Sequence, residues 1–281
     1  MIVVTGATGN VGRPLVQALA AAGEKVTAVS RQIREGAAPE GVRTFAADLT
    51  DSDGLRPAFD GADSLFLHDG GTSAEVLKPG NILELAASAG VSRVVVLSSQ
   101  GVRTRPESHS HGVLMRSLEE AVRQSGLDWT ILRPGGFDSN VYAWAASIRT
   151  DRTVTAPFGD VGLPTVDPTD IADVAAAALR EDGHAGQIYE LTGPALATPR
   201  QQASAIGDAL GEPIRFNEQS RDEARAQMLR FMPEWAVETT LAVLGEPTAA
   251  EQQISPAVER VLGRAPRTFV DWAQAHLPAF R

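Results

Sequence analysis

Residues 2–31 read IVVTGATGNVGRPLVQALAAAGEKVTAVSR and carry the strongest signal for the architecture of the chain. Residues 2–4 predict a short β-strand, and a helix is expected to follow the glycines and to end near Gly23. Residues 25–30 predict a second strand. A strand, a glycine-rich turn, a helix and a strand within thirty residues form a βαβ unit, whose crossover is right-handed. We therefore expect a parallel sheet that starts at residue 2.

The turn after the first strand carries glycines spaced G-x-x-G-x-x-G. Glycines let the backbone turn sharply and approach a pyrophosphate, and the free N–H groups at the start of the helix bind that anion. A tight turn without a ligand is the alternative, but the position between a strand and a helix favours a dinucleotide site. The residues expected to hold the cofactor there are Thr5, Gly6, Ala7, Thr8, Gly9, Asn10, Val11 and Gly12.

The end of the second strand distinguishes NAD(H) from NADP(H). An acidic residue at this point would bind the ribose 2′-hydroxyl and repel a 2′-phosphate. This chain has Ser30 and Arg31 instead. A guanidinium matches the geometry of a phosphate, and a serine hydroxyl can donate to it. We expect NADP(H) to be preferred over NAD(H); the alternative is that Arg31 is a solvated loop charge.

Further strands are predicted at residues 42–46, 64–67, 91–97, 128–132 and 187–191. A helix with a capping-box pattern is expected from about residue 72 to 89. This alternation predicts an α/β fold with a Rossmann-type, doubly wound parallel sheet. Asp48 follows the third strand, where it could hold an adenine amino group or cap the next helix. The other cofactor contacts expected at the carboxyl ends of the strands are Leu49, Leu67, His68, Ser98, Pro134, Gly135 and Phe137.

The C-terminal third does not repeat the βαβ rhythm. Asp167 and Asp170 are expected to cap a helix, and further helices are expected to begin near residues 198 and 220 and to span 231–244 and 266–276. We interpret this region as a small, mostly helical substrate lobe. The predicted cofactor domain covers residues 1–137, with residues 163–192 returning to it. The lobe then comprises residues 138–162 and 193–281.

The composition excludes several classes of function. The chain has 281 residues, 43% hydrophobic and 21% charged, with a net charge of −10 and no cysteine. An acidic surface gives no favourable electrostatic term to nucleic acid or to an anionic membrane. The absence of cysteine excludes thiol and iron–sulfur chemistry, and His109 and His111 with only Glu107 nearby do not predict a metal. With no targeting segment or long apolar run, we expect a cytoplasmic monomer or homodimer that acts on a small molecule.

Five parts of the chain form a characteristic set, namely residues 3–12, Arg31 and residues 94–99, 125–134 and 166–174. Together they resemble the NmrA-like group of atypical short-chain dehydrogenases. The resemblance is strong from the start of the chain as far as about Leu191 and looser afterwards. The G-x-x-G-x-x-G spacing of the glycines is the variant typical of short-chain dehydrogenases. The resemblance implies a Rossmann fold that binds NADP(H) and a small C-terminal lobe. The group includes NADPH:quinone, triphenylmethane, isoflavone-type and imine reductases, as well as non-catalytic regulators that sense NADP.

Ordinary short-chain dehydrogenases use a serine together with a Tyr-x-x-x-Lys pair on the helix before the sixth strand. If Glu119 matches the acidic residue of that helix, the tyrosine and lysine positions fall on His111 and Met115. Neither residue of the pair is present with this spacing anywhere in the chain, which excludes Tyr–Lys carbonyl chemistry and the sugar-nucleotide epimerases and dehydratases. The tyrosines and lysines of the chain are Tyr142, Tyr189, Lys25 and Lys78.

The remaining catalytic candidates are His111 and Ser98, as donors of a proton or a hydrogen bond. His111 could instead be an ordinary histidine in a polar loop, and either Ser98 or Ser99 could face the pocket. Met115 is expected beside the nicotinamide ribose. The residues predicted to line the substrate pocket are His68, Phe137, Tyr142 and Trp144, although the three aromatic residues could belong to the core of the lobe.

These residues predict an NADPH-dependent reductase that transfers hydride to a planar electrophile, namely a quinone, an imine or a conjugated carbonyl. Hydride transfer to such an acceptor does not demand a strong enzymic acid, because the cofactor carries the difficult chemistry. The missing Tyr–Lys pair also fits the alternative function, a non-catalytic NADP(H) sensor that regulates a protein partner.

Overall fold

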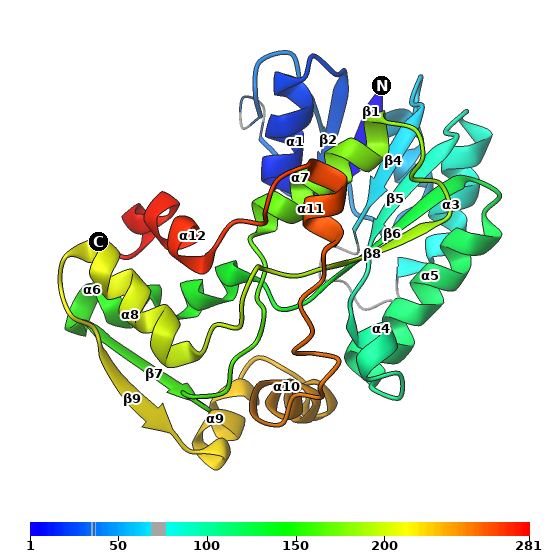
Figure 1. Cartoon of the computed structure of the whole chain (residues 1–281). Helices are drawn as coiled ribbons and strands as arrows, with labels where there is room; N and C mark the ends of the chain where they lie inside the picture. Colours follow the sequence, from blue (N-terminus) through cyan, green and yellow to red (C-terminus); the bar gives the residue numbers. More distant parts are fainter. Residues whose placement is uncertain (35, 37, 69–76) are drawn as a thin grey trace.

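The computed structural model describes residues 1–34, 36, 38–68 and 77–281, and does not describe the side chain of His111 (Figure 1). Among these residues a seven-stranded sheet forms, and every pair of neighbouring strands in it is parallel. The doubly wound α/β fold predicted from the sequence is confirmed. In sheet order the strands are β3 (Arg43–Ala46), β2 (Val26–Ser30), β1 (Ile2–Thr5), β4 (Ser64–Leu67), β5 (Arg93–Leu97), β6 (Asp128–Pro134) and β8 (Gln187–Leu191).

The central strands are apolar without interruption because helices cover both faces of the sheet. Val4 packs on the face covered by α1 (Gly12–Ala21), α7 (Pro168–Arg180) and α11 (Ala257–Leu262). Val3, its neighbour in the chain, faces the opposite side, which is covered by α3 (Pro79–Ser88), α5 (Leu114–Gln124) and the 3-10 helix η1 (Asp53–Ala58). Strand order reverses between β1 and β4, and ligands of such sheets bind at the carboxyl ends of the strands beside this point.

The C-terminal lobe lies beyond the carboxyl ends of these strands (Figure 1). It contains a short parallel pair, β7 (Thr153–Pro157) and β9 (Arg215–Gln219), which the sequence did not predict. The sequence carries no signal for β9, because this strand is mostly polar and exposed and shows no alternation of apolar residues. The helical elements of the lobe are η3 (Asp138–Trp144), α6 (Ala145–Asp151), α8 (Pro199–Leu210), α9 (Arg221–Met228), α10 (Glu234–Gly245), α12 (Phe269–Ala275) and η4 (Leu277–Ala279).

Most predicted helix starts are confirmed at the level of individual hydrogen bonds. The Asp167 side chain accepts a bond from the N–H of Thr169, and both Thr198 and Ser220 form capping boxes. The expected capping role of Asp170 is wrong. Its buried carboxylate instead accepts bonds from Arg264 (2.7 Å) and from the backbone N–H of Arg267 (2.6 Å), so it anchors the returning C-terminal segment.

Other boundaries differ from the prediction. The expected start of a helix at residue 72 lies outside the described residues, and the described helix α3 begins at Pro79. Helix α10 begins at Glu234 and α12 at Phe269, each three residues later than expected. The residues before α5 form a π-helical turn, η2 (His109–Val113), because Gly112 packs against the backbone, where a Cβ would lie 2.2 Å from the Arg105 carbonyl oxygen. No helix in the described part of the chain is long and apolar enough to span a membrane.

Candidate functional site

The glycine-rich turn has no room for side chains at its critical positions. Gly6 has a φ of +63°, and a Cβ there would lie 2.8 Å from Nδ1 of His68. A Cβ on Gly12 would lie 2.1 Å from the carbonyl oxygen of Gly6, whereas the Gly9 N–H donates to that oxygen at 2.9 Å. The turn therefore brings its backbone against the start of α1, as the binding of a pyrophosphate requires.

Polar side chains join this turn to the neighbouring strands. The Thr5 hydroxyl donates to the carbonyl oxygen of Phe66 at 3.0 Å and accepts from the N–H of His68 at 2.8 Å. The N–H of Ala7 donates to the carbonyl oxygen of Val29 at 3.1 Å. These bonds fix the ends of β1, β2 and β4 relative to one another, and they place His68 beside Gly6.

The end of β2 meets the turn at the side expected to hold the adenosine half. The hydroxyls of Thr8 and Ser30 are hydrogen-bonded at 2.8 Å, and Arg31 is exposed next to them. Asp48 accepts bonds from the N–H and the hydroxyl of Thr50, both at 2.9 Å. These bonds, and more weakly the charge of Arg31, lower the pKa of Asp48. Asp48 thus closes a local turn, and the alternative that it caps the next helix is wrong, since Ser52 is the N-cap of η1.

Behind the end of β5 lies a buried network of charged residues around Glu119. Ser98 donates to one oxygen of Glu119 at 2.6 Å, and Arg133 forms two bonds to the same carboxylate at 2.8 and 2.7 Å. Arg123 adds a fourth bond at 2.9 Å. Burial opposes ionisation of Glu119, but the bonds from Arg133 and Ser98 outweigh it, so its pKa is lowered. The sequence predicted neither this network nor its partners.

This network directs the single hydroxyl proton of Ser98 to Glu119, so Ser98 can serve a substrate only by giving up that bond. Ser99 is less buried, and its hydroxyl accepts from the N–H of Gly101 at 3.1 Å. Met115 is half-buried one helical turn before Glu119 in α5 and packs on the core beneath the sheet. The backbone of His111 lies in the π-helical turn, but its side chain is outside the described part of the structure.

The aromatic residues predicted for the substrate pocket separate into two groups. Phe137 is half-buried directly after β6 and pairs with Val166 through a backbone bridge. Tyr142 packs with its ring centroid 5.2 Å from that of Trp272, and Trp144 joins the same cluster. Tyr142 and Trp144 thus belong to the core of the lobe, which was the alternative to the predicted substrate pocket. The remaining predicted contacts lie at the carboxyl edge of the sheet, where Leu49, Leu67 and Pro134 are buried, Gly135 is half-buried, and Val11 is buried at the N-cap of α1.

Residues 6–182 match a family described as NAD(P)H-binding. The chain belongs to this NAD(P)H-binding family. Over its whole length it is 36% identical to a (4-alkanoyl-5-oxo-2,5-dihydrofuran-3-yl)methyl phosphate reductase of Streptomyces griseus, of which it covers 99%. It is also 31% identical over its whole length to an NAD(P)H azoreductase of Xenophilus azovorans, again covering 99% of the relative.

A similar fold is found in the solved structure of a Citrobacter triphenylmethane reductase complexed with NADP(H). The TM-score is 0.79 at 20% identity, with 99% of this chain and 100% of that chain covered. The resemblance to the NmrA-like group is confirmed. As a member of this NAD(P)H-binding family, with relatives named as reductases, the chain is an NAD(P)H-dependent oxidoreductase.

The glycine-rich turn fits the cofactor of the family. The positions that a side chain would fill are glycines, and Asn10 joins the turn to the lobe by donating to the Ser139 hydroxyl at 3.0 Å. The turn would hold the pyrophosphate, and Ser30 and Arg31 lie beside it at the end of β2. The cofactor contacts named from the sequence therefore remain predictions that the geometry accommodates.

Next to Ser139 the structure contains a charged residue that the sequence did not single out. Asp138 is fully buried, and neither of its carboxylate oxygens has a hydrogen-bond partner within the described residues. Burial raises the pKa of Asp138 to about 7, with smaller contributions from the charges of Asp167 and Asp170, and the Thr165 hydroxyl opposes the shift. A single aspartate after a strand gives no sequence signal of burial, so only the packed structure reveals it.

Helix α10 lies along the segment that leads into the π-helical turn. Arg105 forms two bonds to the buried Glu251, at 2.9 and 3.0 Å, and a third to the carbonyl oxygen of Glu246 at 2.9 Å. Further contacts between this segment and α10 lie on the same face of the helix, successively closer to its start. Ser108 donates to the Thr239 hydroxyl at 3.1 Å, and the rings of His109 and Trp235 meet edge to face at 4.8 Å.

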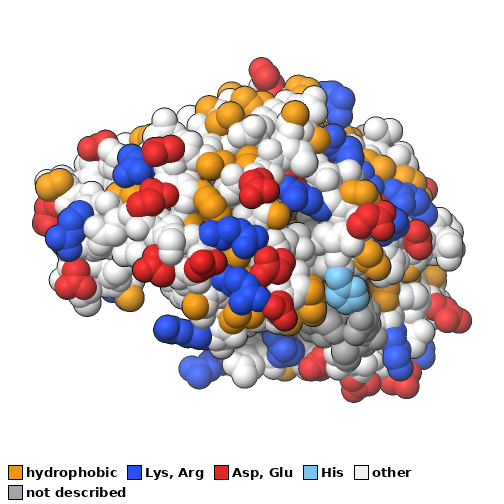
Figure 2. Space-filling view, turned by 90° about the horizontal axis from the view of Figure 1, so that it is seen from below, with side chains coloured by type: hydrophobic (Ala, Val, Ile, Leu, Met, Phe, Trp, Pro, Cys, Tyr) orange, Lys and Arg blue, Asp and Glu red, His pale blue; other side chains and the backbone are white. Residues whose placement is uncertain are grey.

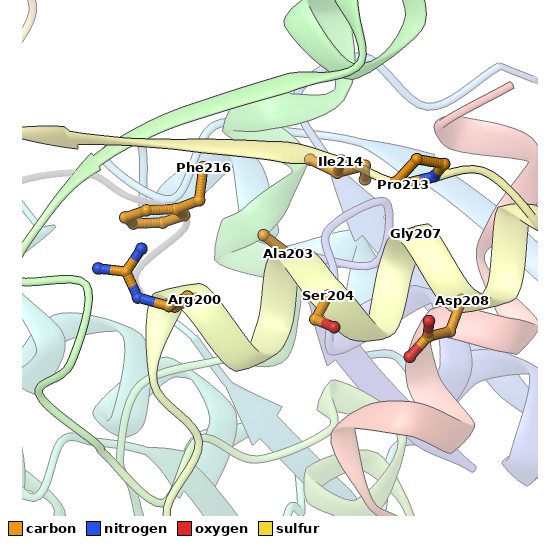
Figure 3. A pocket seen from close by; sticks show the side chains of 8 residues that line it. All are labelled: Arg200, Ala203, Ser204, Gly207, Asp208, Pro213, Ile214 and Phe216. Carbon is orange, nitrogen blue, oxygen red and sulfur yellow. The ribbon is translucent and has the colours of Figure 1, made fainter.

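A separate hollow of about 300 Å³ lies between α8 and β9, within the lobe (Figure 3). Arg200 stacks over the ring of Phe216 at 4.6 Å and is paired with Asp160 and Glu218, so its charge is already balanced. The predicted cofactor and substrate residues do not line this hollow. Its lining consists of Arg200, Ala203, Ser204, Gly207, Asp208, Pro213, Ile214 and Phe216.

Proposed function

We propose that this protein is an NADPH-dependent reductase of a planar electrophile, and that a conjugated carbonyl is its preferred class over a quinone or an imine. The observation that carries the proposal is the combination of a complete glycine-rich turn with a helix α5 that contains neither tyrosine nor lysine. A conjugated acceptor suits such a site, because the cofactor supplies the hydride and one weak acid suffices to protonate the enolate that hydride addition leaves. The relative from Streptomyces griseus, named for an oxo-dihydrofuran substrate, supports the choice of class.

Each group of residues has a defined task in this proposal. Bound NADPH supplies the hydride. The backbone of residues 6–12 holds the pyrophosphate, and Arg31 and Ser30 hold the 2′-phosphate. Phe137 borders the reacting ring on the side of β6, and His68 borders it on the side of β4. The network around Glu119 fixes Arg133 and Ser98 behind the site, and His111 supplies the proton that the reduced carbonyl compound takes up.

Replacing Arg31 by alanine is expected to weaken NADPH binding about 10- to 100-fold, the usual value of a charge-assisted contact to phosphate. NADH binding should change little, because NADH has no 2′-phosphate. Fluorescence titration of both nucleotides measures the two dissociation constants. Arg34→Ala is the matched control, since Arg34 is exposed in the same loop. An equal loss of affinity for NADPH and NADH would contradict the role given to Arg31.

The reaction itself is tested by following NADPH absorbance with a panel of quinones, imines and conjugated ketones. We expect turnover, with the highest kcat/KM on a conjugated ketone. His111→Ala should lower kcat on that ketone about 100-fold, since general acids contribute at least this much. The effect on a quinone should be small, because a reduced quinone needs no strong acid. Tight NADPH binding without turnover on any class would instead favour the sensor function.

A further inference from the structure

The turn between α9 and α10 exposes large apolar side chains, and α10 packs against the π-helical turn η2. Leu229 is 39% exposed, Phe231 72% and Trp235 43%, all within seven residues of the chain. Val113, at the end of the π-helical turn, is 43% exposed. Exposed aromatic residues concentrated in one short segment usually mark a binding surface. We refer to Val113, Leu229, Phe231 and Trp235 as the apolar platform.

The platform is continuous with the turn that carries His111. The contacts between α10 and residues 105–109 run in order along one helix face, and the ring contact of Trp235 with His109 is the last of them. Phe231 lies four residues before Trp235, in the turn that precedes α10, so it adds an exposed ring at the start of this helix. The π-helical turn η2 also contacts the short helix α4 (Gly101–Thr104), which follows β5, so the platform is connected to the carboxyl end of β5 through η2 and α4.

Most charges beside the platform are balanced by one another, while the exposed Arg230 stands between Leu229 and Phe231 in the chain. Arg225 is paired with both Glu234 and Glu238, and Arg221 with Glu238. Seen from the side on which α9 and α10 lie, apolar side chains stand between such groups of acidic and basic ones (Figure 2). Charges that are already neutralised by each other attract no charged partner strongly.

The size of the platform also argues for a small occupant. Full burial of an aromatic side chain covers about 150–250 Å², so these four partly exposed residues offer roughly 400 Å² together. A stable protein interface buries about 800 Å² on each partner. The area therefore suits a hydrocarbon chain better than a second copy of the protein.

We propose that the apolar platform binds the saturated acyl chain of an acyl-substituted conjugated carbonyl substrate. This inference rests on the proposed function and specifies its substrate class. The acyl chain would lie over Phe231 and Leu229, while the conjugated ring lies at the carboxyl ends of β4 to β6. The acyl chain takes no part in the chemistry and contributes only through the transfer of its methylenes out of water. Each methylene should therefore multiply kcat/KM by a similar factor.

The test is a series of conjugated ketones that differ only in acyl chain length, from two to ten carbons, assayed with NADPH. Complete burial of a methylene is worth about a fourfold increase, so a platform that covers one side of the chain should give about twofold per carbon in kcat/KM. In the Leu229→Ser, Phe231→Ser double variant the ratio of kcat/KM between the longest and shortest ketones should fall at least tenfold. Val270→Ser is the matched control, because Val270 is 49% exposed on the distant helix α12 and should leave the ratio unchanged.

The outcomes separate the inference from the proposed function. If no ketone of any length is reduced, the proposed function fails. If all lengths are reduced with equal kcat/KM, or if the double variant keeps the chain-length ratio, the inference alone is overturned. It is also overturned if the double variant changes the molecular mass in analytical ultracentrifugation without changing the ratio, since the platform would then be an interface between two copies.

Discussion

Replacing Asp138 by asparagine is expected to raise the free energy of unfolding at pH 8 by about 3–4 kcal/mol. Burial raises the pKa of Asp138 to about 7, from an ordinary 3.8, and each pKa unit corresponds to about 1.4 kcal/mol. Between these two values the folded protein holds a proton that the unfolded chain has lost. The contribution of Asp138 to stability therefore becomes unfavourable as the pH rises from about 4 to about 7, and it stays so above that range.

Asparagine stays neutral at every pH, so the variant should lack this slope and should be close to wild type at pH 4. Urea unfolding of both proteins at pH 4, 5, 6, 7 and 8 measures the difference. Asp128→Asn is the matched control, because it makes the same change at an exposed aspartate, at the opposite, amino end of β6. Parallel stability curves for wild type and Asp138→Asn would show that Asp138 is ionised in the folded protein.

The second large effect is expected from Glu119→Ala, which should cost about 3–5 kcal/mol of stability. The change removes the bidentate partner of Arg133, whose side chain is only 13% exposed, and leaves its positive charge with only the longer 3.7 Å contact to Glu190. At about 2–4 °C per kcal/mol for a chain of this size, the melting temperature should fall by roughly 10 °C.

Glu120→Ala is the control for this change, because Glu120 is the exposed neighbour on the same helix. Differential scanning calorimetry at pH 7 compares the two variants with wild type. Since the pKa of Glu119 is lowered, its contribution is present above its ordinary pKa and is lost as the pH falls. A loss no larger than that of Glu120→Ala would mean that the network adds nothing to stability.

The sequence predicted those parts of the fold whose signals are local. The strands of the sheet were found because residues such as 94–97 are apolar without interruption, and the dinucleotide turn because its glycines follow a strand. The helix starts at Thr198 and Ser220 were found because capping boxes are written in four consecutive residues. Strand β9 escaped notice because its residues are mostly polar and pair at the edge of a two-stranded sheet.

The candidate site was predicted less completely, because several of its properties depend on contacts between distant residues. The hydrogen bond from Ser98 to Glu119 joins residues that are 21 positions apart in the chain. The burial of Asp138 depends on α7, and the packing of Tyr142 depends on Trp272, more than a hundred residues away. No rule based on residue spacing predicts contacts between residues so far apart in the chain. The sequence could therefore identify the chemical groups of the site but not their partners.

The way in which the chain closes on itself limits how the protein can be divided. Ala257 and Val258 of α11 are buried among residues of α1 and α7, and Asp170 of α7 bonds the segment that follows α11. A fragment that ends at Leu191 would therefore expose an unprotected apolar surface on its cofactor-binding half. The sheet with its helices and the C-terminal lobe are interleaved along the chain, so a single crossover between two related genes could not exchange one without breaking the other.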